Sequence, residues 1–110
     1  MSGYITNPMA CLLKFRLEHK LEESIKIVIA SNSMFPSLRR GDTAFIVSSQ
    51  NYEVGDIIAY AHWEKSITVH RIIRITDNLI YTKGDNNSAE DNYYLTENDI
   101  IGKVKVKEDV

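Results

Sequence analysis

The sequence predicts a compact, mainly β domain with antiparallel strands and one N-terminal amphipathic helix. Short apolar segments rich in β-branched residues alternate with turns that contain Gly-Asp or Asn, a pattern typical of antiparallel strands. The segment before the first of them has apolar residues at every fourth position, which fits a helix. The chain has 110 residues. We therefore expect one domain over residues 1–110, with the helix at 8–24 and a β core at 25–106.

The predicted helix begins at Pro8 and runs to residue 24. Asn7 is a favourable N-cap, and proline is tolerated at the first helical position. The charged residues Lys14, Glu18, Lys20, Glu22 and Glu23 fall elsewhere around the helix. The apolar positions are Met9, Leu13, Leu17, Leu21 and Ile25. We expect this face to pack on its own domain, and the alternative is a docking surface for a partner.

Six segments after the helix are predicted as strands, because they are short, apolar and rich in β-branched residues. They are residues 25–30, 43–48, 56–62, 67–76, 79–83 and 100–106. Gly-Asp pairs at 41–42, 55–56 and 84–85 mark turns that introduce or interrupt these segments.

Composition excludes several classes of protein. The chain has 13 basic and 15 acidic residues and a net charge of -2, so we expect no nucleic-acid partner. Cys11 is the only cysteine, which excludes an intramolecular disulfide and offers no cysteine cluster for zinc. No apolar run approaches the roughly 18 residues of a membrane-spanning helix, and residues 1–7 are unlike a signal peptide. We therefore expect no transmembrane segment and a soluble, cytoplasmic protein.

Ser33 is the candidate nucleophile. It follows the first predicted strand and precedes Met34-Phe35-Pro36. A serine hydroxyl reacts poorly at neutral pH, so it needs an adjacent base and a rigid position. Pro36 disfavours helical conformations at Phe35, which helps to fix a non-helical turn around Ser33. A serine in a polar turn is most often only a turn residue, so other residues must support the assignment.

His70 is the candidate general base, since imidazole suits proton abstraction near neutral pH. It lies in an apolar strand, where a half-exposed structural histidine is the ordinary interpretation. His62, beside Trp63 at a predicted strand end, is a weaker candidate. A catalytic histidine needs a third group to fix its tautomer, and Asp85 and Asp91 both follow the fifth predicted strand. The spacing does not decide between them, and either could simply cap the turn.

Six segments occur in the order found in type I signal peptidases, across about two-thirds of the chain. They read SNSMFP (31–36), LRRGD (38–42), VGDIIAY (54–60), VHRII (69–73), TKGDNN (82–87) with Asp91 following, and IIGKV (100–104). The chain resembles the catalytic domain of this family, especially its archaeal, endoplasmic-reticulum and sporulation-type branch. The resemblance implies a β fold shared with the SOS-repressor autoproteases.

The resemblance also implies roles for individual residues. Ser33 matches the nucleophile, and His70 matches a position that carries a lysine base in the bacterial housekeeping branch. Asp91 matches the third member of a Ser-His-Asp triad, and Asp85 matches a second important aspartate, expected to be structural. The Ser33 amide and the Ser31 hydroxyl match the oxyanion hole.

The expected function is that of a serine endopeptidase that cleaves a peptide or leader-bearing precursor through an acyl-enzyme. No metal or organic cofactor is implied. Signal peptidases normally carry a transmembrane helix where this chain has the charged segment 8–24. We therefore expect a small soluble member acting on a peptide substrate, with a possible docking partner on the helix. The alternatives are a catalytically silent peptide-binding module with the same fold, and a self-processing protein.

Overall fold

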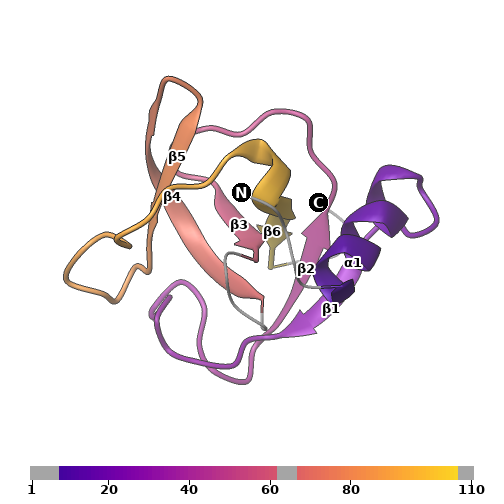
Figure 1. Ribbon diagram of the computed structural model, residues 1–110. Helices are drawn as coiled ribbons and strands as arrows, with labels where there is room; N and C mark the ends of the chain where they lie inside the picture. Colours follow the sequence, from indigo (N-terminus) through magenta and orange to yellow (C-terminus); the bar gives the residue numbers. More distant parts are fainter. Residues whose placement is uncertain (1–7, 62–66, 107–110) are drawn as a thin grey trace.

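The computed structural model describes residues 8–61 and 67–106 (Figure 1). Along the chain the elements are α1 (Pro8–Glu18), β1 (Ile25–Val28), β2 (Thr43–Val47), β3 (Ile57–Tyr60), β4 (Thr68–Thr76), β5 (Leu79–Lys83), the 3₁₀ helix η1 (Glu97–Asp99) and β6 (Ile100–Lys105). The predicted N-cap residue Asn7, the weaker candidate His62 and its neighbour Trp63 lie outside the described residues.

The strands form one six-stranded sheet in the order β1-β2-β6-β3-β4-β5. Each neighbouring pair is antiparallel. The prediction of a mainly β, antiparallel domain with an N-terminal helix is therefore confirmed. The sheet is curled, so β1 and the start of β4 line the same cavity although three strands separate them in the sheet order. This curl places the segment after β1 next to β4.

The sheet buries side chains on both of its faces. Ile58 and Ala59 are neighbours on β3, both fully buried, and they point to opposite faces because strand side chains alternate. Ala59 packs in a cluster with Met34 and Leu38 from the segment after β1. Ile58 packs in a second cluster with Tyr60 and residues of β4, β5 and β6. The second cluster lies under the face from which His70 projects, since His70 is the cross-strand partner of Ile58.

The strand boundaries differ from the prediction mainly at the ends. The fifth strand, Leu79–Lys83, matches it, and β6 ends one residue early. β1 ends at Val28 instead of residue 30. The Ile29 amide donates to the Asp42 carbonyl and the Ile29 carbonyl accepts from the Gly41 amide, so two residues of the turn before β2 face this one residue. Regular pairing therefore stops three residues before Ser31.

The helix is shorter than predicted. It ends at Glu18, because Lys20 adopts a left-handed conformation with φ of 59°. The Lys20 amide donates to the Leu17 carbonyl at 3.2 Å, and the Leu21 amide donates to the Arg16 carbonyl at 2.9 Å. These two bonds form a Schellman motif, which satisfies the last carbonyls of a helix. The apolar repeat continues beyond this point, but Leu21 is 67% exposed whereas Leu17 is buried.

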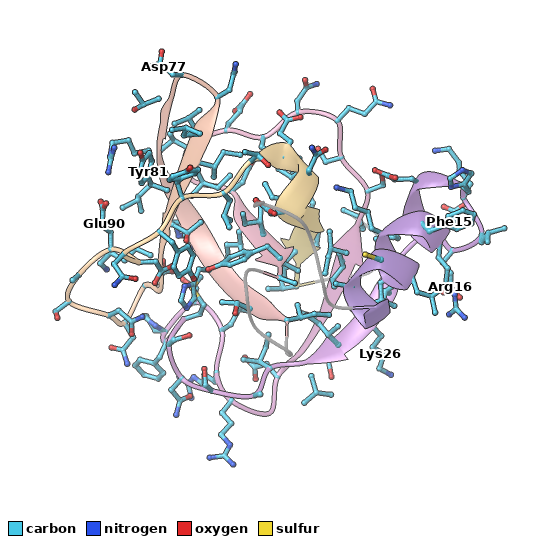
Figure 2. All side chains as sticks on the ribbon, viewed as in Figure 1. Phe15, Arg16, Lys26, Asp77, Tyr81 and Glu90 are labelled. Carbon is cyan, nitrogen blue, oxygen red and sulfur yellow. The ribbon has the colours of Figure 1, made fainter. Side chains whose placement is uncertain are left out.

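The inner side of α1 packs on the domain, as expected. Ala10 and Leu17 are buried in the first core cluster. Phe15 and Arg16 project away from the sheet (Figure 2), and Leu12 and Phe15 are 47% and 49% exposed. A docking role for this outer side stays a prediction. Within the described ranges, no helix combines the length and apolar character needed to cross a membrane.

Replacing Lys20 with glycine should stabilise the protein. Glycine adopts positive φ without the steric cost that a side chain carries there. We expect the free energy of unfolding to rise by about 0.5–1 kcal/mol, measured by urea denaturation. The matched control is Glu18→Gly, which puts the same residue at the last helical position, where φ is not positive, and should destabilise by at most about 1 kcal/mol. Equal losses in both variants would contradict the Schellman assignment.

Candidate active site

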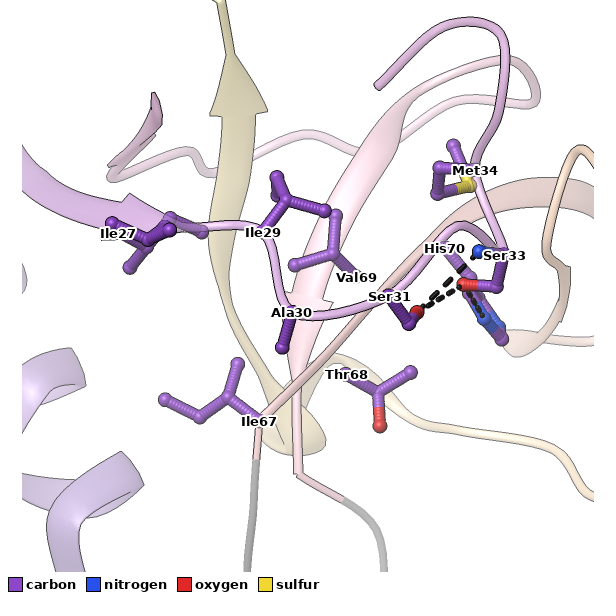
Figure 3. A pocket seen from close by; sticks show the side chains of 11 residues that line it. Ile27, Ile29, Ala30, Ser31, Ser33, Met34, Ile67, Thr68, Val69 and His70 are labelled. Atoms are coloured by element: carbon purple, nitrogen blue, oxygen red, sulfur yellow. Dashed lines mark hydrogen bonds between the residues drawn. The ribbon is translucent and has the colours of Figure 1, made fainter. Parts of the chain in front are cut away.

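Three side chains from distant segments meet at one point. Ser33 lies in the turn after β1, His70 on β4, and Asp91 in the segment after β5. His70 Nε2 lies 3.2 Å from Ser33 Oγ (Figure 3), and His70 Nδ1 lies 2.8 Å from Asp91 Oδ2. The His70 and Asp91 side chains are only 10% and 12% exposed. The structure therefore brings together the three residues that the resemblance singled out.

The order of these contacts fixes how the histidine is protonated. An ionised Asp91 carboxylate can only accept hydrogen bonds, so the neutral imidazole donates its proton through Nδ1. The Nε2 lone pair is then left to accept the hydroxyl proton of Ser33. This is the hydrogen-bond order of a serine–histidine–aspartate triad.

Asp91 is held by β5 rather than by its own turn. Its amide donates to the Thr82 carbonyl at 2.9 Å, and the Thr82 hydroxyl donates to Asp91 Oδ2 at 2.6 Å. The Tyr60 hydroxyl also donates to Asp91 Oδ2, at 3.3 Å. Thr82 and Tyr60 are both fully buried. Sequence reasoning missed both residues. One feature of the sequence could have indicated Thr82: it lies two positions after Ile80 in the same strand, so its polar side chain shares the inward-facing side with that apolar residue.

The turn after β5 also holds Ser33 in place. The Asn86 amide donates to the Ser33 carbonyl at 2.8 Å, and its side-chain amide donates to the Asn32 carbonyl at 3.2 Å. The Asp85 amide donates to the Met34 sulfur at 3.4 Å. Each residue from Asn32 to Met34 is thus bonded to the turn, which gives Ser33 the rigid position that a nucleophile needs.

Gly84 lets the two turns approach. A Cβ atom on Gly84 would lie 2.8 Å from the Ser33 carbonyl oxygen and 2.7 Å from the Asn87 side-chain nitrogen. The Asn87 side chain can move aside, but the carbonyl belongs to the backbone that carries the nucleophile. Any side chain at position 84 therefore displaces Ser33.

Asp85 does not contact His70. It forms a paired ion contact with Arg71, with distances of 2.8 and 2.7 Å to Nε and Nη2. It also accepts a hydrogen bond from Ser37 at 2.7 Å. Hydrogen bonding from Arg71 lowers the pKa of Asp85 below its ordinary value of 3.8, with a smaller contribution in the same direction from Ser37. Arg71 also donates to the Gly55 carbonyl at 2.8 Å, so this network ties three loops together.

Ser31 lies beside the nucleophile. Its hydroxyl donates to Ser33 Oγ at 3.3 Å and accepts from the Ser33 amide at 3.4 Å (Figure 3). Both distances are long for hydrogen bonds of these types, so the contacts are easily exchanged for others. The oxyanion-hole role of Ser31 stays a prediction, as do the catalytic roles of the other site residues.

A cavity of about 500 Å³ opens next to Ser33. Its walls come from the end of β1 and the start of β4, and they are mainly aliphatic (Figure 3). The apolar wall residues include Ile27, Ile29, Ala30, Met34, Ile67 and Val69. Ser33 and His70 line the same cavity, so a group bound in it lies within reach of the hydroxyl. The sequence could not show this cavity, since its walls meet only when the sheet curls.

Ser33, His70 and Asp91 are arranged in the order of the serine–histidine–aspartate triads found in many serine peptidases. The Peptidase S24-like family model matches residues 4–105, and the chain belongs to that family. The prediction of a signal-peptidase-like serine peptidase is thereby confirmed at the level of the family.

Curated relatives agree with this assignment. The chain is 38% identical to the signal peptidase complex catalytic subunits SEC11 of Zygosaccharomyces rouxii and Eremothecium gossypii, and 39% identical to that of Candida tropicalis. Each match covers 72% of this chain and 56% of the relative. The chain thus spans little more than half the length of these relatives.

The prediction of a cytoplasmic location is wrong in the light of these relatives. Each of them is named as the catalytic subunit of a signal peptidase complex, not as a free cytoplasmic enzyme. The prediction rested on the lack of an apolar run in the sequence, which says little about the complexes in which a catalytic domain works.

Replacing Gly84 with alanine should move the nucleophile. The new Cβ pushes against the Ser33 carbonyl, so a crystal structure of the variant should show Ser33 Oγ outside hydrogen-bonding distance of His70 Nε2. We expect the free energy of unfolding to fall by about 1–3 kcal/mol. Gly55→Ala is the control, because Gly55 has a positive φ but a Cβ atom added to it would meet nothing within 4 Å. That variant should lose stability through strain and keep the contact between Ser33 and His70. An unchanged contact in Gly84→Ala would refute the role assigned to this glycine.

The ion pair of Asp85 with Arg71 should make stability depend on pH in a defined direction. Folding lowers the pKa of Asp85, so the ionised carboxylate stabilises the folded state. This contribution to the free energy of unfolding is fully present above the ordinary pKa of 3.8, and it is lost as pH falls through the folded-state pKa. We expect Asp85→Asn to reduce the free energy of unfolding by about 1–3 kcal/mol at neutral pH, and by less in acid.

Urea denaturation at several pH values measures this difference. Glu90→Gln is the control, since its ion pair with Arg74 is exposed and should contribute at most about 1 kcal/mol. A difference between wild type and Asp85→Asn that is the same at every pH would contradict the linkage.

Proposed function

We propose that this chain is a serine endopeptidase of the signal-peptidase type that uses Ser33, His70 and Asp91 as a catalytic triad. The observation that carries the proposal is the 3.2 Å contact between His70 Nε2 and Ser33 Oγ at the edge of the aliphatic cavity. A base at this distance from a hydroxyl has the reach needed for proton transfer.

In the first step, His70 Nε2 removes the Ser33 proton as Oγ attacks the carbonyl carbon of the scissile peptide bond. Asp91 accepts the hydrogen bond from Nδ1 throughout and stabilises the imidazolium that forms. The imidazolium then donates its Nε2 proton to the leaving amine, which departs and leaves an ester on Ser33. A water molecule, deprotonated by His70, hydrolyses the ester and restores the serine.

Negative charge develops on the carbonyl oxygen during each attack. The Ser33 amide and the Ser31 hydroxyl, now in long contact with each other, are donors close to that oxygen. We propose that the substrate oxygen replaces their mutual contact and receives both hydrogen bonds. Donors already in place cost little reorganisation when the charge forms, which lowers the barrier.

The substrate is proposed to be a precursor with an amino-terminal leader, since the relatives are named as catalytic subunits of a signal peptidase complex. The cavity wall supports a peptide with apolar side chains, because the aliphatic residues of β1, of the segment after it and of β4 line a cavity that reaches Ser33 (Figure 3). The proposed chemistry uses only side chains and a backbone amide of this protein together with water.

Replacing members of the triad tests the proposal. Ser33→Ala and His70→Ala should each lower kcat for a leader-peptide substrate by at least about 10³-fold, and the double variant should be little worse than either. Cleavage is followed by mass spectrometry of a peptide library derived from signal sequences. Ser88→Ala, in the exposed part of the same loop system, is the control and should retain full activity.

The same experiment separates the alternatives. A self-processing protein would shorten its own chain without added peptide, in wild type but not in Ser33→Ala. A silent binding module would retain peptide without cutting it. Cleavage that persists in Ser33→Ala would exclude the proposed mechanism.

A further inference from the structure

The hydroxyl of Tyr60 lies at the centre of a buried cluster behind the triad. Tyr60 is the last residue of β3 and is fully buried. Its hydroxyl is 2.7 Å from that of Tyr93, 3.3 Å from Thr82 Oγ1, 3.3 Å from Asp91 Oδ2 and 3.5 Å from His70 Nδ1. One neutral group therefore touches, or nearly touches, both partners of the histidine–aspartate pair.

The donor and the acceptor of each hydrogen bond in this cluster can be assigned. Thr82 has one hydroxyl proton. Because Thr82 Oγ1 lies 2.6 Å from the carboxylate oxygen Asp91 Oδ2, Thr82 donates this proton to Asp91. Thr82 Oγ1 can then only accept from Tyr60, and Asp91 can only accept. The single proton of Tyr60 therefore points toward Thr82 and Asp91, which leaves Tyr93 to donate in the 2.7 Å contact between the two phenols.

Irregular strand pairing directs the Tyr60 side chain toward this cluster. The pairing of β3 with β6 shifts by one residue between Ala59 and Tyr60, so Ala59 opposes Gly102 whereas Tyr60 opposes Ile100. A second shift, between Ile72 and Arg74 on β4, lies next to Thr82. Bulges of this kind redirect side chains and occur often beside active sites. Both irregularities of the sheet thus adjoin the residues that hold Asp91.

We propose that Tyr60 is a positioning residue for the reaction: its hydroxyl, oriented by Tyr93, fixes the Asp91 carboxylate so that His70 keeps Nε2 toward Ser33. The effect of Tyr60 on catalysis rests on the proposed function. Its effect on the position of Asp91 rests on the hydrogen bonds alone. Tyr60 touches no substrate and acts only through Asp91 and His70.

A neutral donor suits this role. Burial raises the pKa of Tyr60 far above that of an exposed phenol, and the nearby Asp91 charge acts in the same direction. Tyr60 therefore stays protonated at neutral pH, and it orients the carboxylate without adding a charge that would compete with the imidazolium. A phenylalanine would fill the same apolar space in the cluster of Ile58 and Ile72 without supplying this hydrogen bond.

The test replaces Tyr60 with phenylalanine, which keeps the ring and removes the hydroxyl. We expect kcat for a leader-peptide substrate to fall about tenfold with KM unchanged. In the free protein, the His70 Nδ1 proton, followed by NMR, should exchange faster with water, because a loosened Asp91 holds it less constantly. Tyr52→Phe is the control, since Tyr52 packs against the same core cluster on the side toward Lys103. It should change neither quantity.

Tyr93→Phe provides a second variant if Tyr60→Phe does not fold. It removes the donor to Tyr60 from a half-buried position, and it should produce smaller changes of the same sign. An unchanged kcat and an unchanged exchange rate in the tyrosine variants of an active protein would overturn the inference and leave the proposed function standing. A wild type that cleaves no peptide would reject the proposed function, while faster exchange in Tyr60→Phe would still support the positioning of Asp91 by Tyr60.

Discussion

The contact between the turn after β1 and the turn after β5 is the constraint on which the site depends. It includes the 2.8 Å backbone hydrogen bond from the Asn86 amide to the Ser33 carbonyl, and it requires glycine at position 84. One turn carries Ser33, and the other begins the segment that ends at Asp91. Their contact therefore sets the backbone position of Ser33 relative to β4 and β5 at the same time.

The two faces of β4 carry residues with different contacts. His70 and Arg71 are neighbours, so their side chains point to opposite sides of the sheet. His70 faces the cluster that holds Asp91, whereas Arg71 binds Asp85 and thereby braces the turn that positions Ser33. The two aspartates that the sequence offered thus have separate roles. Asp91 meets the imidazole, and Asp85 ties its turn to the strand that carries the imidazole.

Much of the fold and the principal site residues could be predicted from the sequence. Strand segments were evident because they are short, apolar and rich in β-branched residues, and Ser33 and His70 were selected because the segments around them match those of a known family in order. Spacing alone did not decide between Asp85 and Asp91, since spacing along a turn does not encode which carboxylate faces a strand, and only the family resemblance favoured Asp91. The end of α1 was missed because Lys20 adopts a conformation that usually marks glycine. Tyr60 and Thr82 were missed because a hydroxyl in a strand has the same appearance in sequence whether it faces solvent or a buried carboxylate.

The proposed mechanism requires that Ser33, activated by His70, becomes covalently acylated. Acid-quenched mass spectrometry of the protein during reaction with a leader-peptide ester tests this directly, with peptide mapping to locate the adduct. We predict that wild type gains the mass of the acyl group on Ser33, and that His70→Ala and Ser33→Ala gain none. Turnover of the ester with no adduct on Ser33, or an adduct that forms equally well without His70, would contradict it.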